Sequence, residues 1–179
     1  MTAFENCTSF LFNSTTGLCT PSALTNETQP LPTSEEGDLF QSFHCNTSTG
    51  FSAAIYGDTV VCVALFGPAN YAEAGADCQD KGAYLASVKT SEKYSFLSQV
   101  AGNHNLWVGC DDLQQEGTFV WREDGQEVTL IERTNVFDAS DPATDDALED
   151  CVSFHPSHSG LRDDDCSLSQ SYVCEMPYG

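Results

Sequence analysis

The residues best suited to chemistry are carboxylates that follow a short apolar run. Residues 106–108 (LWV) are strand-forming types, and the adjacent acids Asp111 and Asp112 come soon after them, with Glu116 just beyond. Carboxylate oxygens are the ligands that calcium prefers in proteins. The pattern predicts a buried strand that delivers a cluster of acids to a surface loop.

The charge of the whole chain limits its partners. The formal net charge is -21, from 27 acidic residues against 6 Lys and Arg. Such an excess repels nucleic-acid phosphates and anionic membrane surfaces, and we exclude both as partners. It suits a divalent cation or a basic partner, and it also serves solubility. No apolar run approaches the length of a membrane span, so we predict no membrane insertion.

Nine cysteines indicate an oxidising compartment. Four glycosylation sequons near the N-terminus agree with this. We therefore expect a secreted, extracellular glycoprotein, and because no signal sequence opens the chain we take it as the mature form. The predicted glycosylation sites are Asn6, Asn13, Asn26 and Asn46.

Composition divides the chain into two parts. Residues 1–44 are rich in Thr, Ser and Asn, and Cys7 and Cys19 could close a small loop there. Within this part, Pro21 to Asp38 has the composition of an extended linker. Residues 45–179 form the predicted domain.

The domain alternates strand and helix patterns. Asn70 and Glu73 form a capping box at the start of one helix, and Thr90 or Ser91 caps a second. Arg122 to Ala147 shows little periodicity. The predicted strands are Thr59–Phe66, Ala83–Val88, Phe119–Trp121, Cys151–Phe154 and Tyr172–Cys174, and the predicted helices are Tyr71–Lys81 and the segment ending at Val100.

Several short sequence motifs follow one another along the second part of the chain. These are CQDKGAYLASV, WVGC, DDLQQEGTFVW, EDCV and YVCE, between Cys62 and Glu175. In this order and at these spacings they resemble the C-type lectin-like domain. The resemblance implies an α+β, disulfide-bonded fold with two helices, two small antiparallel sheets and long loops that often bind calcium and sugar.

The resemblance also implies a disulfide frame, although sequence alone cannot establish connectivity. The family pattern maps onto Cys78–Cys174 and Cys151–Cys166. The long form of the domain adds an N-terminal bridge, for which Cys45–Cys62 is the candidate, and Cys7–Cys19 would then pair. This leaves Cys110 as a buried free thiol or as one half of an intermolecular bridge.

At the family's principal calcium site, the resemblance implies Asp141, Glu149 and Asp163 as metal ligands that would also contact the sugar. Two positions depart from the family pattern. Ala143 has no side-chain oxygen, and Arg162 places a cation where an amide binds both ion and sugar. Either neighbouring acids replace the missing amides, or Arg162 pairs with Asp141 or Glu149 and occupies the place of the ion. The replacement acids are Asp145, Asp146, Asp163, Asp164 and Asp165.

The family's auxiliary calcium site matches better. Its ligand positions fall on Asp112, Glu116, Glu149 and Asp150, while Thr144 stands where a further Asp is common. The alternative is a solvated acidic face.

Other chemistry has little support. His155 and His158 lack the helical frame of a zinc pair, and we expect them to be surface residues. Trp107 and Trp121 lie in apolar runs and are predicted to be core residues. No catalytic motif appears, and we predict that the chain is not an enzyme.

We therefore predict a secreted carbohydrate-recognition protein that binds a glycan, with Ca²⁺ ordering its loops. The alternative is a lectin-like fold used for contact with an extracellular protein or for structural assembly, including self-association as a homo-oligomer, without sugar binding.

Overall fold

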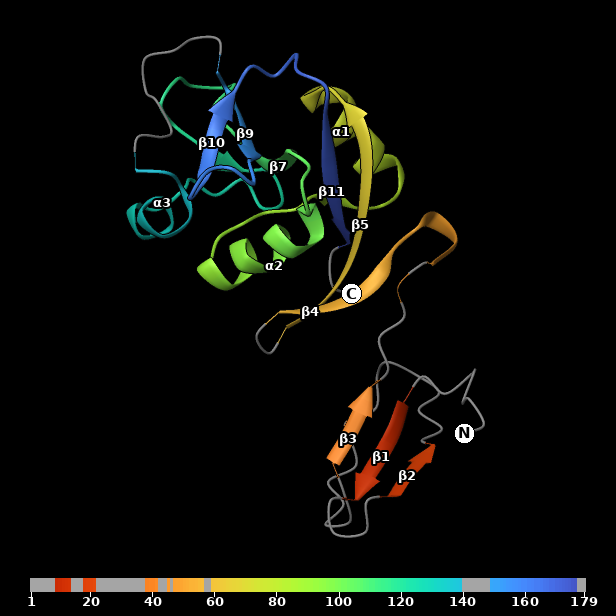
Figure 1. The fold of residues 1–179 in the computed structure, drawn as a ribbon. Coiled ribbons are helices and arrows are strands. Elements are labelled where there is room, and N and C mark those ends of the chain that lie inside the picture. The colour runs from red at the N-terminus through yellow and green to blue at the C-terminus, as the bar shows by residue number, and fades with distance from the viewer. Residues whose placement is uncertain are drawn as a thin grey trace. The chain divides into compact units, whose positions relative to one another are not determined.

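The structure is a computed structural model. It describes residues 9–13, 18–21, 38–41, 45, 47–56, 59–139 and 149–176. The chain divides into two compact units, Met1–Cys45 and Asn46–Gly179, and each is described by itself (Figure 1).

The N-terminal unit contains an antiparallel sheet of three strands. Strand β1 (Ser9–Asn13) lies between β2 (Leu18–Pro21) and β3 (Asp38–Gln41). We predicted no strands here, although the apolar residues Phe10–Phe12 lie on β1, and Leu39 and Phe40 lie on β3. The two strands pair with Phe10 opposite Phe40. Such short apolar groups can form the strands of a small sheet, but they are too short to show the alternating pattern from which a strand is predicted.

Several predictions for this part stay predictions. Cys7, Asn6, Asn26, Asn46 and residues 22–37 of the expected linker lie outside the described residues, and Asn13 is the last residue of β1.

The C-terminal unit is built on a sheet of eight strands with the order β10-β9-β7-β11-β5-β4. Strand β6 pairs with β11, strand β8 pairs with β7, and a short 3₁₀ helix (η1, Thr47–Thr49) precedes β4. The strands are β4 (Ser52–Tyr56), β5 (Thr59–Ala69), β6 (Tyr84–Leu85), β7 (Leu106–Asp111), β8 (Val120–Trp121), β9 (Cys151–Phe154), β10 (Leu161–Asp164) and β11 (Gln170–Met176).

The predicted α+β class is confirmed, but the strands form one mixed sheet where we expected two small antiparallel ones. Strands β7 and β11 run parallel, with Tyr172 opposite Trp107. A parallel pair needs a long connection, and here the described chain between them contains helix α3 and the three strands β8, β9 and β10. The predicted strand 83–88 is regular only at Tyr84–Leu85.

Both predicted helices are present. Helix α1 (Tyr71–Asp80) begins with the expected capping box, in which the Asn70 side chain accepts from the Glu73 amide at 2.9 Å. Helix α2 (Ser91–Ala101) is capped by Thr90. Its inner face also holds Lys93, which pairs with Glu175 of β11 at 2.6 Å.

A third helix, α3 (Leu130–Val136), lies in the segment that we predicted to be irregular. A helix is recognised in a sequence when its apolar residues gather on one buried face. Leu130 and Ile131 are 80% and 73% exposed, so they do not form such a face. The capping box of Thr129 and Glu132, with an amide-to-hydroxyl distance of 3.2 Å, is the pattern that would have found it.

The core of this unit surrounds β7, which is buried along its whole length. Trp107 and Trp121 are fully buried, as predicted, and the Trp107 indole donates to the Ala69 carbonyl at 3.0 Å. Two disulfides frame this core. Cys78–Cys174 joins α1 to β11, and Cys151–Cys166 joins the start of β9 to the loop after β10.

The remaining cysteines that the structure describes are consistent with the predicted frame. Cys45 and Cys62 are each disulfide-bonded, while Cys110 is a buried free thiol. Among the described residues, no helix has the length and apolar character needed to cross a membrane.

The Cys78–Cys174 bridge closes a loop with a sequence separation of 96, so its removal should release a large amount of unfolded-state entropy. We expect the double variant Cys78→Ala, Cys174→Ala to lose about 2–5 kcal/mol of unfolding free energy, measured by urea titration. The control is Cys110→Ala, which removes a buried sulfur without removing a cross-link. A loss no larger than that of the control would contradict the role of this bridge.

Candidate metal centre

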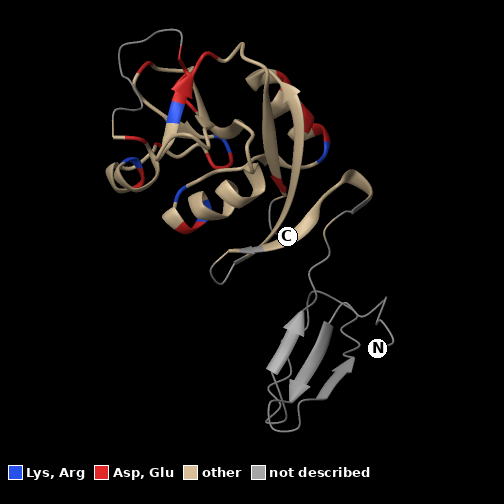
Figure 2. Cartoon of the chain, in the orientation of Figure 1, with Lys and Arg blue, Asp and Glu red and all other residues tan. Residues whose placement is uncertain are grey.

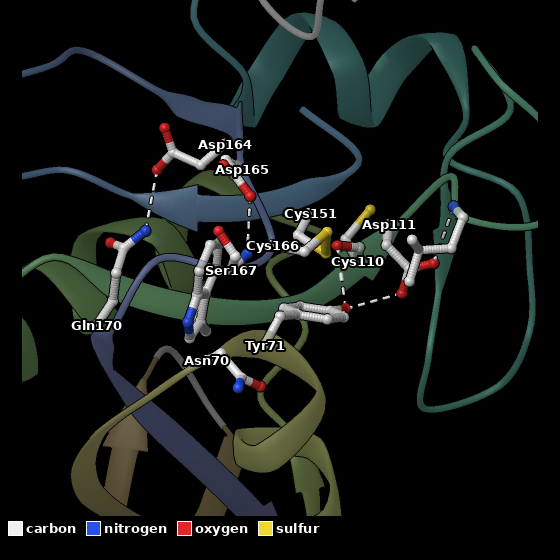
Figure 3. Close-up of a disulfide and its surroundings, with 12 residues drawn as sticks. Asn70, Tyr71, Cys110, Asp111, Cys151, Asp164, Asp165, Cys166, Ser167 and Gln170 are labelled. Atoms are coloured by element: carbon white, nitrogen blue, oxygen red, sulfur yellow. Dashed lines mark hydrogen bonds between the residues drawn. A yellow bond between two sulfur atoms is a disulfide. The ribbon is translucent and has the colours of Figure 1, made fainter. Parts of the chain in front are cut away.

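The two acids at the end of β7 have different surroundings. Asp111, the last residue of β7, is 0% exposed. It accepts a hydrogen bond from the Tyr71 hydroxyl at 2.8 Å (Figure 3). It also pairs with the Arg122 guanidinium through both Nε and Nη2. The prediction that this acid reaches a surface loop is wrong, because a buried carboxylate with these partners is already satisfied inside the protein.

Asp112 has only part of its hydrogen-bonding capacity filled. It is 2% exposed, and its Oδ2 atom accepts from the Gly117 amide at 2.7 Å. Its Oδ1 atom is buried and has no hydrogen-bond partner among the described residues. Leaving a buried carboxylate oxygen without a donor or a cation costs free energy.

Backbone hydrogen bonds hold this acid in place. The Asp112 amide donates to the Asp150 carbonyl at 3.1 Å, which ties the loop after β7 to the segment before β9. The Gln115 amide donates to the Asp112 carbonyl at 2.9 Å. Gly117 has a φ of +76°, a conformation that suits glycine at this turn.

Three carboxylates converge here. Asp112, Glu116 and Asp150, which we call the acidic cluster, each offer an oxygen, and these atoms lie within 4.8 Å of one another. Glu149, predicted with them, is next in sequence but is not among the three that converge. Oxygen ligands brought from two loops fit a hard divalent cation such as calcium.

The electrostatics of the cluster agree with this fit. Burial raises the pKa of Asp112, the Gly117 hydrogen bond opposes the rise, and the charge of Asp150 adds to it. A cation would reverse this unfavourable balance because it compensates both burial and repulsion. Acidic residues are also distributed over several other elements of this unit (Figure 2).

The principal site is described only in part. Residues 141–146, which include Asp141, Pro142, Ala143 and Thr144, lie outside the described residues. Asp163 is buried on β10 opposite Val152 of β9, and Glu149 is half-buried. The Arg162 guanidinium lies 3.2 Å from the His158 ring nitrogen Nε2. The convergence of Asp141, Glu149 and Asp163 stays a prediction.

Two of the proposed replacement acids are engaged by protein donors. Asp164 accepts from the Ser153 hydroxyl at 2.6 Å and the Gln170 amide at 3.1 Å, and it lies 2.6 Å from the His155 ring nitrogen Nε2. The Asp165 carboxylate accepts from the Ser167 amide at 2.8 Å (Figure 3). These contacts orient both acids within the protein, so neither is a good substitute for a missing metal ligand.

Two concavities of the described surface are lined by other residues. One, of about 600 Å³, is lined by neutral or weakly basic residues between Gly67 and Ser171, and a smaller one of about 120 Å³ lies between Gly117 and Arg133. Neither is lined by an acid of the cluster. The acidic cluster therefore suits an ion held between loops better than an enclosed organic ligand.

The mixed sheet, the flanking helices, the long loops and the two disulfides together define a C-type lectin-like fold. A family model described as Lectin C-type domain matches residues 67–176, more than half of the chain, and the chain therefore belongs to this family.

Related proteins agree with this assignment. The chain is 30% identical over 110 residues to C-type lectin domain family 4 member M of Nomascus concolor, which covers 60% of this chain and 26% of the relative. It is 27% identical over 110 residues to Lectin BRA-3 of Megabalanus rosa, covering 60% of this chain and 64% of the relative. In both cases the chain spans less than two thirds of the relative's length.

Solved structures show the same fold. The Kupffer cell C-type lectin receptor Clec4f, whose structure is described as trimeric, superposes with a TM-score of 0.62 at 24% identity, covering 74% of this chain and 85% of that one. A Ca²⁺-dependent type II antifreeze protein in its Ca²⁺-free form has a TM-score of 0.58 at 21% identity, covering 70% of this chain and 97% of that one.

The hydrogen bonds of Asp164 generate a pH-dependent prediction. Burial alone would raise its pKa, but the hydrogen bonds from His155, Ser153 and Gln170 outweigh burial and hold the pKa below its usual range. The stabilisation from this carboxylate is therefore present above the unfolded pKa, near about 4, and is lost as the pH falls through the lower folded value.

We expect Asp164→Asn to reduce the unfolding free energy most above about pH 4, with the difference from the wild type shrinking at more acidic pH. Urea unfolding across this pH range measures the effect, and Asp80→Asn on the exposed face of α1 is the control. A difference that stays constant with pH would show that the charge of Asp164 contributes nothing.

Proposed function

We propose that this chain is a calcium-dependent, glycan-binding recognition domain that works outside the cell. The observation that carries the proposal is the buried Oδ1 atom of Asp112, which has no hydrogen-bond partner in the part of the chain that the structure describes. Asp112 belongs to a cluster with Glu116 and Asp150. Membership of the C-type lectin family and the lectin names of its relatives support the proposal. The disulfides support the extracellular setting.

Calcium would be held by the three carboxylates of the acidic cluster. When bound, it supplies positive charge that compensates their burial and mutual repulsion. The cluster joins the loop after β7 to the segment before β9, so the ion would stabilise both together. The described part of the segment before β9 begins with Glu149, which we place with Asp163 and Asp141 at the proposed sugar site.

A second candidate function is supported by different residues. Arg162, in place of a neutral amide, lies against His158, and Leu130 and Ile131 form an exposed apolar pair at the start of α3. A cation and an apolar surface favour contact with an extracellular protein, or with further copies of this chain, over contact with sugar hydroxyls.

Calcium should stabilise the folded protein. We expect calcium to raise the Tm of metal-free protein. The unfolding free energy should increase by about 2.7 kcal/mol when the free calcium concentration is about 100 times Kd. Asp112→Asn should abolish most of this gain because it removes the charge of the buried ligand. Asp80→Asn removes the same charge from exposed α1 and should leave the gain intact. No gain in the wild type, or equal gains in both variants, would contradict the proposed metal site.

Glycan binding should depend on the same ion. We expect retention on an array of immobilised glycans in calcium, loss of retention in EDTA, and loss of retention with Asp163→Asn in calcium. If the protein is not retained but self-associates in a salt-dependent way, measured by sedimentation velocity, the second candidate function is supported and glycan recognition is contradicted.

A further inference from the structure

We propose that Tyr71, Asp111 and Arg122 form a positioning network that sets the calcium affinity of the acidic cluster without contacting the ion. The inference rests on the proposed function in one respect, because it takes calcium as the ion bound by Asp112, Glu116 and Asp150. Tyr71, Asp111 and Arg122 are not among the residues that the family resemblance assigns as metal ligands.

The Asp111 carboxylate is the centre of the network. Its Oδ2 atom accepts from the Tyr71 hydroxyl and from Arg122 Nε, while its Oδ1 atom accepts from Arg122 Nη2 and, at 3.3 Å, from the Leu113 amide. The bond to Leu113 spans Asp112 and so restricts the backbone of the metal ligand itself. The direction of the Asp112 side chain is therefore linked to the contacts of its neighbour.

Tyr71 connects this centre to the second loop of the cluster. Its hydroxyl lies 2.8 Å from Asp111 Oδ2 and 3.1 Å from the Cys110 carbonyl oxygen. Its amide donates to the Cys166 carbonyl at 3.1 Å, and Cys166 is bonded to Cys151 (Figure 3). Because Cys151 directly follows the ligand Asp150, Tyr71 holds the chain near both loops of the cluster.

Charge gives the network a second role. A guanidinium close to a cation site repels the cation unless an anion compensates it. Asp111 is this anion for Arg122. Its fully buried carboxylate accepts from two nitrogen atoms of the Arg122 guanidinium. One acid of the consecutive pair thus neutralises the arginine, and Asp112 keeps its charge for the ion.

The test is Tyr71→Phe, which removes the hydroxyl and keeps the ring that packs edge-on against Trp107 at a centroid distance of 5.5 Å. Tyr172→Phe is the matched control. Tyr172 is as buried as Tyr71, both being 6% exposed, and its hydroxyl also donates to a carboxylate, Asp77, at 2.6 Å. Asp77 lies on α1 and is not part of the acidic cluster.

Calcium Kd is measured by calorimetry on the full chain, and Tm is measured in EDTA. We expect Tyr71→Phe to weaken calcium binding by about 10-fold, the lower end of the effect for groups that orient metal ligands. Tyr172→Phe should leave Kd within about 2-fold of the wild type, since its partner Asp77 is not part of the cluster. Both variants should lower the Tm in EDTA.

Two outcomes would overturn the inference, and they differ. If the wild type binds calcium and Tyr71→Phe keeps its Kd while losing as much Tm as the control, the network is structural only. If the wild type binds no calcium, the proposed function fails and the positioning role fails with it.

Discussion

The C-terminal unit depends on how it accommodates two consecutive carboxylates at the end of a fully buried strand. Transfer of a charged carboxylate into a protein interior is tolerated only when donors or opposite charge replace its water. Asp111 finds both in Arg122 and Tyr71. Asp112 has one donor to its side chain, the Gly117 amide, and its second oxygen is buried with no hydrogen-bond partner among the described residues. The described residues therefore satisfy one acid within the fold and leave the next with a buried oxygen that a cation would stabilise.

Both a disulfide and non-covalent contacts bring the residues of the acidic cluster together. Asp150 directly precedes Cys151, whose bridge to Cys166 fixes the start of β9. Asp112 directly follows β7, which lies between β9 and β11 in the sheet. Acids that are distant along the chain thus meet because their flanking residues are held by a disulfide, strand pairing and a backbone hydrogen bond.

Much of this arrangement was predictable from sequence, for identifiable reasons. The capping box at Asn70 and the apolar run of β5 are local patterns, and the family motifs placed Asp112, Glu116 and Asp150 together. The division of roles between Asp111 and Asp112 was not predictable, because it depends on the β7–β8 pairing that brings Arg122 beside Asp111. Helix α3 was missed because two of its three apolar residues, Leu130 and Ile131, are exposed. The parallel β7–β11 pair was missed because strand register depends on residues that are far apart in the sequence.

Crystals grown with calcium would test the central claim most directly, through the anomalous difference density at the acidic cluster. We expect a peak about 2.3–2.6 Å from oxygens of Asp112, Glu116 and Asp150, the range of calcium–oxygen bonds in proteins. The absence of a peak there, with Asp112 Oδ1 instead hydrogen-bonded to a protein donor or to water, would contradict it.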